Sequence, residues 1–210
     1  MRAESRNGAA SVTGLILAGG QGRRMGGVDK GLQPFCGRPL IESVIERFAP
    51  QVSELLLSVA PGAEPYERYG ARLVADEFRA PGGTSAGPLA GLHAGLGACS
   101  HPLLATVPCD APHLPADLVA RLRDALQSAA ADVAVVRTGP YLQPVFALMR
   151  RELRPALLAF LELGGRKTDA WYSTLNAVEV PFDDQAEAFA NLNTLAELHR
   201  LEKGRIAESP

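Results

Sequence analysis

A glycine-rich turn near the start of the chain is followed by cationic side chains, and together they suit the binding of a polyphosphate. Gly19 and Gly20 belong to the turn, Arg24 and Lys30 are among the cations, and Asp29 is the one acidic residue. Glycine lets a ligand approach the peptide groups closely because no Cβ intervenes, and a run of exposed amide N–H groups can bind an anion. The ordinary alternative is a glycine-rich turn with solvated arginines, so the residue types favour phosphate binding without deciding it.

Two familiar phosphate-binding motifs do not match this stretch. A P-loop requires Gly-Lys followed by Ser or Thr, whereas Lys30 lies between Asp29 and Gly31. The dinucleotide fingerprint requires a glycine where this chain has Met25. The residues alone therefore leave the enzyme class open.

Two aspartates stand directly after apolar segments and are candidates for ligand binding. Asp110 follows the apolar run 103–107, and Mg²⁺ prefers one or two carboxylates together with phosphate oxygens and water. An aspartate that caps a turn is an equally good interpretation of Asp110. Asp76 follows the run 72–75, and its carboxylate could accept from the N1–H and exocyclic amino group of guanine, although such residues commonly serve only in turns.

Several segments resemble, in this order, the signature of the molybdenum cofactor guanylyltransferases, a family of the nucleotidyltransferase superfamily. The matching stretches are Leu-Ala-Gly-Gly at 17–20 continuing to Asp-Lys and Leu32, Gly-Arg-Pro-Leu at 37–40, Gly-Pro-Leu-Ala-Gly at 87–91, Pro-Cys-Asp-Ala-Pro at 108–112 and Asn-Leu-Asn-Thr at 191–194. The resemblance covers the chain from Thr13 to about Leu201. It implies a three-layer α/β/α, Rossmann-like fold of the nucleotide-diphospho-sugar transferase type, in which a mostly parallel sheet has helices on both faces.

The same resemblance implies an activity and a set of site residues. The activity is transfer of GMP from GTP to the molybdopterin-bound molybdenum cofactor, with release of pyrophosphate and with Mg²⁺ as cofactor. Arg24, Lys30 and Asp110 are the implied catalytic residues, and Asp110 is the implied metal ligand. The implied GTP-binding residues are Leu17, Ala18, Gly19, Gly20, Lys30, Asp76 and Asp110, and Asn191 and Asn193 are implied to contact the cofactor substrate.

The chain departs from the family pattern at one position. Where relatives commonly carry an asparagine after the second strand, this chain reads Ser58-Val-Ala60. The nucleotide contact of that asparagine is therefore lost, or replaced by Ser58 or by water.

The segments that must position these residues alternate between apolar strands and amphipathic helices. We expect strands at 15–18, 54–59, 72–75, 103–107, 133–136, 143–148 and 176–180. We expect helices that begin at Arg38-Pro39, Pro88, Pro115 and Leu153, with a last one capped by Thr194 and Glu197. This alternation predicts a largely parallel sheet. Because ligands bind such sheets at the carboxyl ends of the strands, the glycine-rich loop, Asp76 and Asp110 should meet at one rim.

Length and composition predict one globular domain. The chain has 210 residues, 47% of them hydrophobic and 21% charged, which is enough for one substantial core. We assign 12–203 to a nucleotidyltransferase domain, with 1–11 as a flexible tail and 204–210 as a second tail. The net charge of −2 gives no reason to expect nucleic acid or a membrane surface as partner, and no apolar run approaches the roughly 18 residues that span a bilayer.

The cysteines and the N-terminal segment favour a cytoplasmic protein. Cys36, Cys99 and Cys109 are too widely spaced to indicate a disulfide framework or a zinc site. We interpret Cys109 as a small buried thiol rather than a nucleophile. The first residues lack the apolar segment of a secretory signal.

Three other functions compete with guanylyl transfer. Transfer from CTP to the same cofactor, or from a nucleotide to a sugar phosphate, would use a similar scaffold; a sugar-specific enzyme is usually longer. A non-catalytic nucleotide-binding or carrier protein is the alternative of another class, and the joint presence of Arg24, Lys30 and Asp110 argues against it. The resemblance also suggests molybdenum-insertion proteins and molybdoenzyme chaperones as partners.

Overall fold

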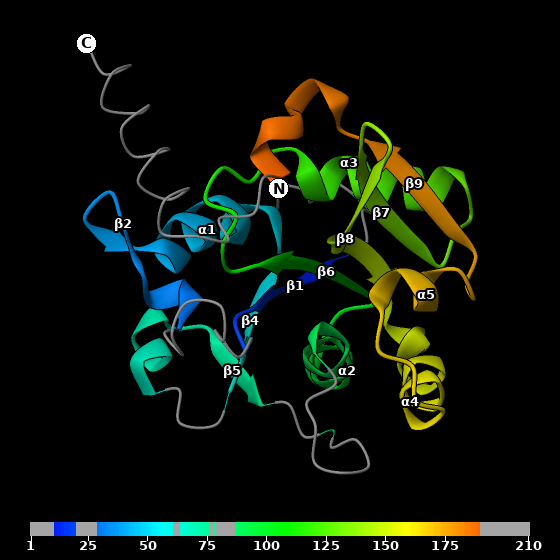
Figure 1. The fold of residues 1–210 in the computed structure, drawn as a ribbon, viewed down its shortest axis with the longest axis horizontal. Coiled ribbons are helices and arrows are strands. Elements are labelled where there is room, and N and C mark those ends of the chain that lie inside the picture. Colours follow the sequence, from blue (N-terminus) through cyan, green and yellow to red (C-terminus); the bar gives the residue numbers. More distant parts are fainter. Residues whose placement is uncertain (1–10, 20–28, 61–63, 76–77, 79–86, 190–210) are drawn as a thin grey trace, which may run out of the picture.

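The computed structural model describes residues 11–19, 29–60, 64–75, 78 and 87–189. Within these residues, seven strands form one sheet in the order β5-β4-β1-β6-β8-β7-β9 (Figure 1). The strands are β1 (Val12–Leu17), β4 (Glu54–Val59), β5 (Arg72–Ala75), β6 (Leu103–Pro108), β7 (Val133–Thr138), β8 (Tyr141–Arg150) and β9 (Ala177–Pro181). A separate hairpin pairs β2 (Pro34–Phe35) with β3 (Arg38–Pro39).

Most of the sheet is parallel, as predicted. β1 pairs in parallel with both β4 and β6, β4 with β5, and β7 with β9. β8 is antiparallel to both of its neighbours, β6 and β7. It is reversed because only Gly139 and Pro140 separate it from β7, and a connection that short can join only antiparallel strands. All strands of the sheet except β8 therefore end at the same edge.

Helices cover both faces of the sheet, which confirms the three-layer prediction (Figure 1). One face carries α1 (Leu40–Phe48) and α3 (Leu118–Ser128), and the other carries α2 (Pro88–Ala98), α4 (Arg154–Glu162) and the short α5 (Thr168–Tyr172). Short 3-10 helices complete the described elements: η2 (Lys30–Leu32), η3 (Ala49–Gln51), η4 (Glu64–Tyr69), η5 (Arg151–Leu153) and η6 (Asp183–Phe189). Each face has its own buried apolar cluster, so the sheet separates two cores.

The first helix illustrates how the sequence pattern becomes packing. Ile41, Val44 and Phe48 recur at helical spacing, and all three are buried against the sheet. Phe48 packs over Gly14 of β1, where a Cβ would lie 2.7 Å from its ring. A side chain at Gly14 would therefore push the helix away from the sheet.

The start of this helix was predicted wrongly. Arg38 and Pro39 do not begin it; they form β3, and the helix starts at Leu40 with Pro39 as the residue before it. Cys36 and Gly37 have positive φ angles of 50° and 77°, which suits the tight turn between β2 and β3. The hairpin therefore takes up the residues that the proline pattern assigned to the helix.

Other boundaries moved by a few residues. β1 covers residues 12–17 instead of 15–18, because Thr13 and Gly14, although not apolar, lie buried within it. The helix expected from Pro115 begins at Leu118, and α5 was not predicted. The capped helix at Thr194 lies outside the described residues. Among the described residues, we find no helix whose length and hydropathy would allow it to cross a membrane.

Candidate active site

The ends of β1 and β6 form the floor of the candidate site. Their pairing continues one residue past the strands, where the Cys109 N–H donates to the Leu17 carbonyl at 3.2 Å. On the other side of β1, the Ala18 N–H donates to the Ser58 carbonyl at 2.8 Å. These bonds fix the first residues of both loops that leave the rim.

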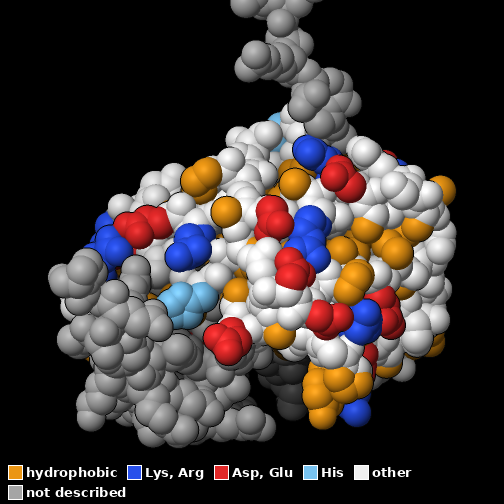
Figure 2. Space-filling view, turned by 90° about the horizontal axis from the view of Figure 1, so that it is seen from above, with side chains coloured by type: hydrophobic (Ala, Val, Ile, Leu, Met, Phe, Trp, Pro, Cys, Tyr) orange, Lys and Arg blue, Asp and Glu red, His pale blue; other side chains and the backbone are white. Residues whose placement is uncertain are grey.

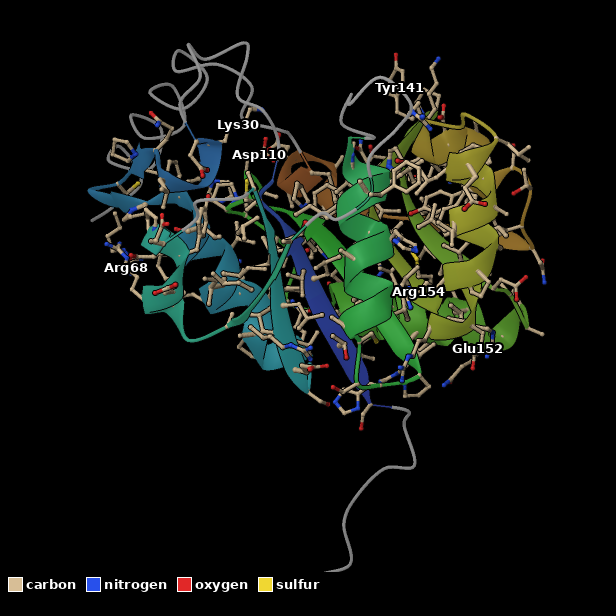
Figure 3. All side chains as sticks on the ribbon, turned by 90° about the horizontal axis from the view of Figure 1, so that it is seen from below. Lys30, Arg68, Asp110, Tyr141, Glu152 and Arg154 are labelled. Carbon is tan, nitrogen blue, oxygen red and sulfur yellow. The ribbon has the colours of Figure 1, made fainter. Side chains whose placement is uncertain are left out.

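Lys30 and Asp110 form an ion pair at this rim, with 3.1 Å between Nζ and Oδ2. Lys30 begins η2 and Asp110 follows β6, and Figure 3 shows them together at the edge where these strands end. The Asp110 side chain is only 9% exposed, whereas that of Lys30 is 27% exposed. The predicted meeting of the first loop and Asp110 is thus confirmed for this pair, although 80 positions separate them.

Asp29 holds the turn that presents Lys30. Its carboxylate accepts from the Gly31 N–H at 3.1 Å and from the Tyr66 hydroxyl. Its carbonyl accepts from the side-chain amide of Gln33 at 3.3 Å. The one acidic residue of the loop therefore serves as an organiser of the turn.

Tyr66 reaches this turn from η4, where it is almost completely buried. Burial raises the pKa of Tyr66 well above its ordinary value, and the hydrogen bond to Asp29 raises it further. The phenol therefore stays protonated and remains a donor throughout the physiological range. Sequence reasoning missed Tyr66 because it belongs to none of the recognised motifs and to no periodic segment. Its only signal was an aromatic residue between Pro65 and Glu67.

Cys109 is a buried thiol, as the sequence suggested. Burial raises its pKa far above the ordinary value, and the neighbouring charge of Asp110 adds to this effect. A thiol that stays protonated is a poor nucleophile. Cys99 is buried as well, whereas Cys36 is exposed.

The structure describes only some of the residues that are predicted to contact the nucleotide. Leu17 is partly buried at the end of β1, Ala18 is buried and Gly19 is exposed at the rim. Because the Ala18 N–H is already bonded to Ser58, Ala18 can offer a nucleotide its carbonyl but not its donor. The predicted residues Gly20, Arg24, Asp76, Asn191 and Asn193 lie outside the described residues.

Ser58 is poorly placed to replace the family asparagine. Its side chain is buried, with Oγ facing α2, where a Cβ on Gly91 would lie 2.4 Å from it. The exposed residue after β4 is Ala60, which has no polar side chain. This placement favours loss of the contact or its replacement by water.

Charged side chains of both signs are mixed on the surface. Figure 2 shows acidic and basic groups next to one another on the face viewed from above. Exposed ion pairs contribute to this mixture, among them Arg38–Glu46 and Arg121–Asp184.

Tyr141, at the start of β8, is 71% exposed and lies at the same edge of the sheet as Lys30 and Asp110 (Figure 3).

Comparison with solved structures shows which proteins share this fold. The fold matches a molybdopterin-guanine dinucleotide biosynthesis protein A from Archaeoglobus fulgidus, with a TM-score of 0.75, 24% identity and coverage of 93% of this chain and 99% of that one. It also matches a 2-C-methyl-D-erythritol 4-phosphate cytidylyltransferase from Thermus thermophilus, with a TM-score of 0.68, 19% identity and coverage of 94% and 99%. Both likenesses show that this chain shares the fold of those two proteins.

Sequence comparison gives the particular family. Residues 14–178 match the MobA-like NTP transferase domain. A molybdenum cofactor guanylyltransferase of Bordetella petrii is 50% identical over 90% of this chain and 96% of its own length, and one of Ralstonia nicotianae is 46% identical over 93% and 98%. The chain belongs to the molybdenum cofactor guanylyltransferase family, and it is a nucleotidyltransferase.

Proposed function

We propose that this protein transfers GMP from GTP to the phosphate group of the molybdopterin-bound molybdenum cofactor, and that it releases pyrophosphate. The observation that carries the proposal is the Lys30–Asp110 pair, held at the rim where β1 and β6 end. The names of relatives that are 46% and 50% identical over nearly their whole length support this choice of substrates.

The reaction needs positioning more than covalent help. A phosphate oxygen of the cofactor forms a bond to the α-phosphorus of GTP. The bond from that phosphorus to the oxygen bridging to the β-phosphate breaks, and its electron pair leaves with pyrophosphate. The protein must therefore hold the triphosphate, neutralise its charge and align the attacking oxygen.

Lys30 and Asp110 provide opposite charges for this task. Lys30 is the more exposed partner, so its ammonium group can move from Asp110 to an incoming β- or γ-phosphate. Asp110 is then free to bind a cation that accompanies the nucleotide. Its hard carboxylate oxygens fit Mg²⁺, which commonly takes one or two protein carboxylates and completes its shell with phosphate oxygens and water. When bound, Mg²⁺ supplies charge neutralisation across the phosphates.

The remaining predicted residues are included in the proposal by their positions in the family motifs. Gly20 and Arg24 would bind phosphate, and Asp76 would accept from guanine. Asn191 and Asn193 would contact the cofactor substrate. Leu17, Ala18 and Gly19 would line the nucleotide site with their backbone, Ala18 through its carbonyl.

The cellular setting completes the proposal. We infer a cytoplasmic enzyme whose catalytic domain is 12–203, flanked by tails at 1–11 and 204–210. Molybdenum-insertion proteins and molybdoenzyme chaperones are the proposed protein partners, since they would supply the substrate and receive the product.

A nucleotide panel tests the choice of GTP. The binding of GTP, CTP, ATP and UTP in the presence of Mg²⁺ is measured by calorimetry, and the dinucleotide formed with molybdopterin is identified by mass. GTP should bind best and give the product, and Asp76→Ala should narrow the preference by about 1–3 kcal/mol, the effect of one lost contact. Equal binding of all four nucleotides would contradict the assignment, and preferential transfer from CTP would support the cytidylyl alternative.

A further inference from the structure

A continuous set of contacts links the buried Tyr66 to the Lys30–Asp110 pair. The Tyr66 hydroxyl donates to the Asp29 carboxylate, which also accepts from the Gly31 N–H at 3.1 Å. Lys30 lies between Asp29 and Gly31 in the chain, and its Nζ is 3.1 Å from Oδ2 of Asp110. Tyr66 itself comes from η4, a different part of the chain.

We propose that Tyr66 is a positioning residue for nucleotidyl transfer, which acts by fixing the Asp29 turn so that the Lys30 ammonium group is presented to the nucleotide phosphates. This inference rests on the proposed function of the Lys30–Asp110 pair. Tyr66 contacts neither of those two side chains through its hydroxyl, and it acts on them only through Asp29.

The local packing shows that the hydroxyl has a defined place. A Cβ built on Gly31 would lie 2.6 Å from the Tyr66 hydroxyl oxygen, whereas the next atom of that ring would be 3.5 Å away. The absence of a side chain at residue 31 therefore makes room for the hydroxyl in particular. Gly31 is itself buried, so the turn cannot easily move outward to accommodate a larger group.

Tyr69 provides a matched control within the same helical segment. Its ring lies 6.1 Å from that of Tyr66, between centroids, and packs against the same apolar core. Its charged neighbour is different: the Arg68 guanidinium carbon lies 5.0 Å from the Tyr69 ring centroid. Removing either hydroxyl leaves a phenylalanine in the core, but only the Tyr66 hydroxyl bonds to Asp29 in the structure.

The first experiment compares Tyr66→Phe with Tyr69→Phe in the full chain. We expect Tyr66→Phe to lower kcat/KM for GTP about tenfold, which corresponds to roughly 1.4 kcal/mol, and Tyr69→Phe to change it less than about twofold. Without nucleotide, the Gly31 amide hydrogen should exchange faster in Tyr66→Phe alone, because its acceptor is less firmly held. Equal kcat/KM in the two variants would overturn the inference.

A double-mutant cycle with Lys30→Ala shows whether Tyr66 acts through Lys30. Binding of GTP with Mg²⁺ is measured by calorimetry for the parent, both single variants and the double variant. If Tyr66 positions Lys30, Tyr66→Phe weakens binding in the parent but has no further effect once Lys30 is alanine. If Tyr66 only supports the fold, Tyr66→Phe weakens GTP binding equally in the parent and in Lys30→Ala. That result would overturn the positioning role.

A size exchange gives an independent readout. Gly31→Ala should lower both the melting temperature and GTP affinity, because its Cβ meets the Tyr66 hydroxyl. Adding Tyr66→Phe removes that oxygen, so it should recover part of the lost melting temperature while GTP affinity stays low. Recovery of both quantities would show that the hydroxyl has no role beyond packing.

The parent protein separates failure of this inference from failure of the proposed function. A parent that neither binds GTP nor transfers GMP overturns the proposed function, and the positioning role with it. An active parent with an unaffected Tyr66→Phe variant overturns the positioning role alone.

Discussion

The two edges of the sheet, where its parallel strands begin and where they end, each hold a buried or partly buried carboxylate. The two carboxylates differ in the groups that contact them. At the edge where β1 and β4 begin, Glu54 accepts from the Thr13 hydroxyl at 2.6 Å and from the Ser100 hydroxyl and N–H at 2.8 and 3.0 Å. At the opposite edge, Asp110 contacts the Lys30 ammonium group at 3.1 Å. The first carboxylate is held by neutral donors, whereas the second faces a cation.

This difference separates a structural carboxylate from one suited to chemistry. Desolvation raises the pKa of Glu54, but the hydrogen bonds from Thr13 and Ser100 outweigh it, so the pKa lies below its ordinary value. Those donors have no charge to give to a ligand. In the proposed mechanism, by contrast, Lys30 exchanges Asp110 for a phosphate of the nucleotide, and its departure leaves Asp110 able to bind a cation.

The largest effect is expected from Asp110→Asn. The variant keeps the size of the side chain but removes the charge that a metal requires, so transfer should fall on the order of 10²–10³-fold, as when one electrostatic contact to a transition state is removed. The variant should remain folded and still bind GTP, although more weakly. Turnover against Mg²⁺ concentration, with melting temperature measured on the same samples, tests this. The parent's rate and metal dependence in the variant would show that Asp110 is not the metal ligand.

Glu54→Ala should show the opposite behaviour. Loss of its hydrogen bonds with Thr13 and Ser100 should reduce the free energy of unfolding by about 1–3 kcal/mol, while GTP transfer per folded molecule stays unchanged. Urea unfolding and kinetics below the transition measure the two quantities. Glu46→Ala, which removes an exposed ion pair with Arg38, is the control and should cost less than about 1 kcal/mol. A Glu54→Ala variant that is stable but inactive would contradict the division between the two edges.

The smallest effect is a pH dependence assigned to Glu54. Because its pKa is lower in the folded protein than the ordinary value of about 4.3, its contribution to stability is complete above that value. The contribution is lost as pH falls through the folded pKa. The difference in free energy of unfolding between the parent and Glu54→Gln should therefore be largest near pH 6 and shrink below about pH 4. A difference that stays constant down to pH 3, measured by urea unfolding, would assign the effect to packing instead.

Much of this fold could be predicted from the sequence because its signals are local. Apolar runs such as 54–59 and 103–107 marked buried strands, and the helical spacing of Val44 and Phe48 marked a packed face. The strands of such a sheet end at one edge, so the placement of Asp110 near the first loop followed without any contact being known. The motifs around Lys30 and Asp110 likewise indicated the family.

The sequence by itself determined the seven strands of the main sheet, most of the helices and the largely parallel character of the sheet, since each depends on residue type and spacing over a few neighbours. Only the tertiary structure decided that β8 is antiparallel to its neighbours and that Ser58 faces α2. It also decided that Glu54 accepts a hydrogen bond from Ser100 and that Tyr66 reaches Asp29. These facts depend on which strands pair, in which register, and on how closely glycines such as Gly31 let other segments approach. No periodicity along the chain records that information, because the partners are distant in sequence and meet only once the core has packed.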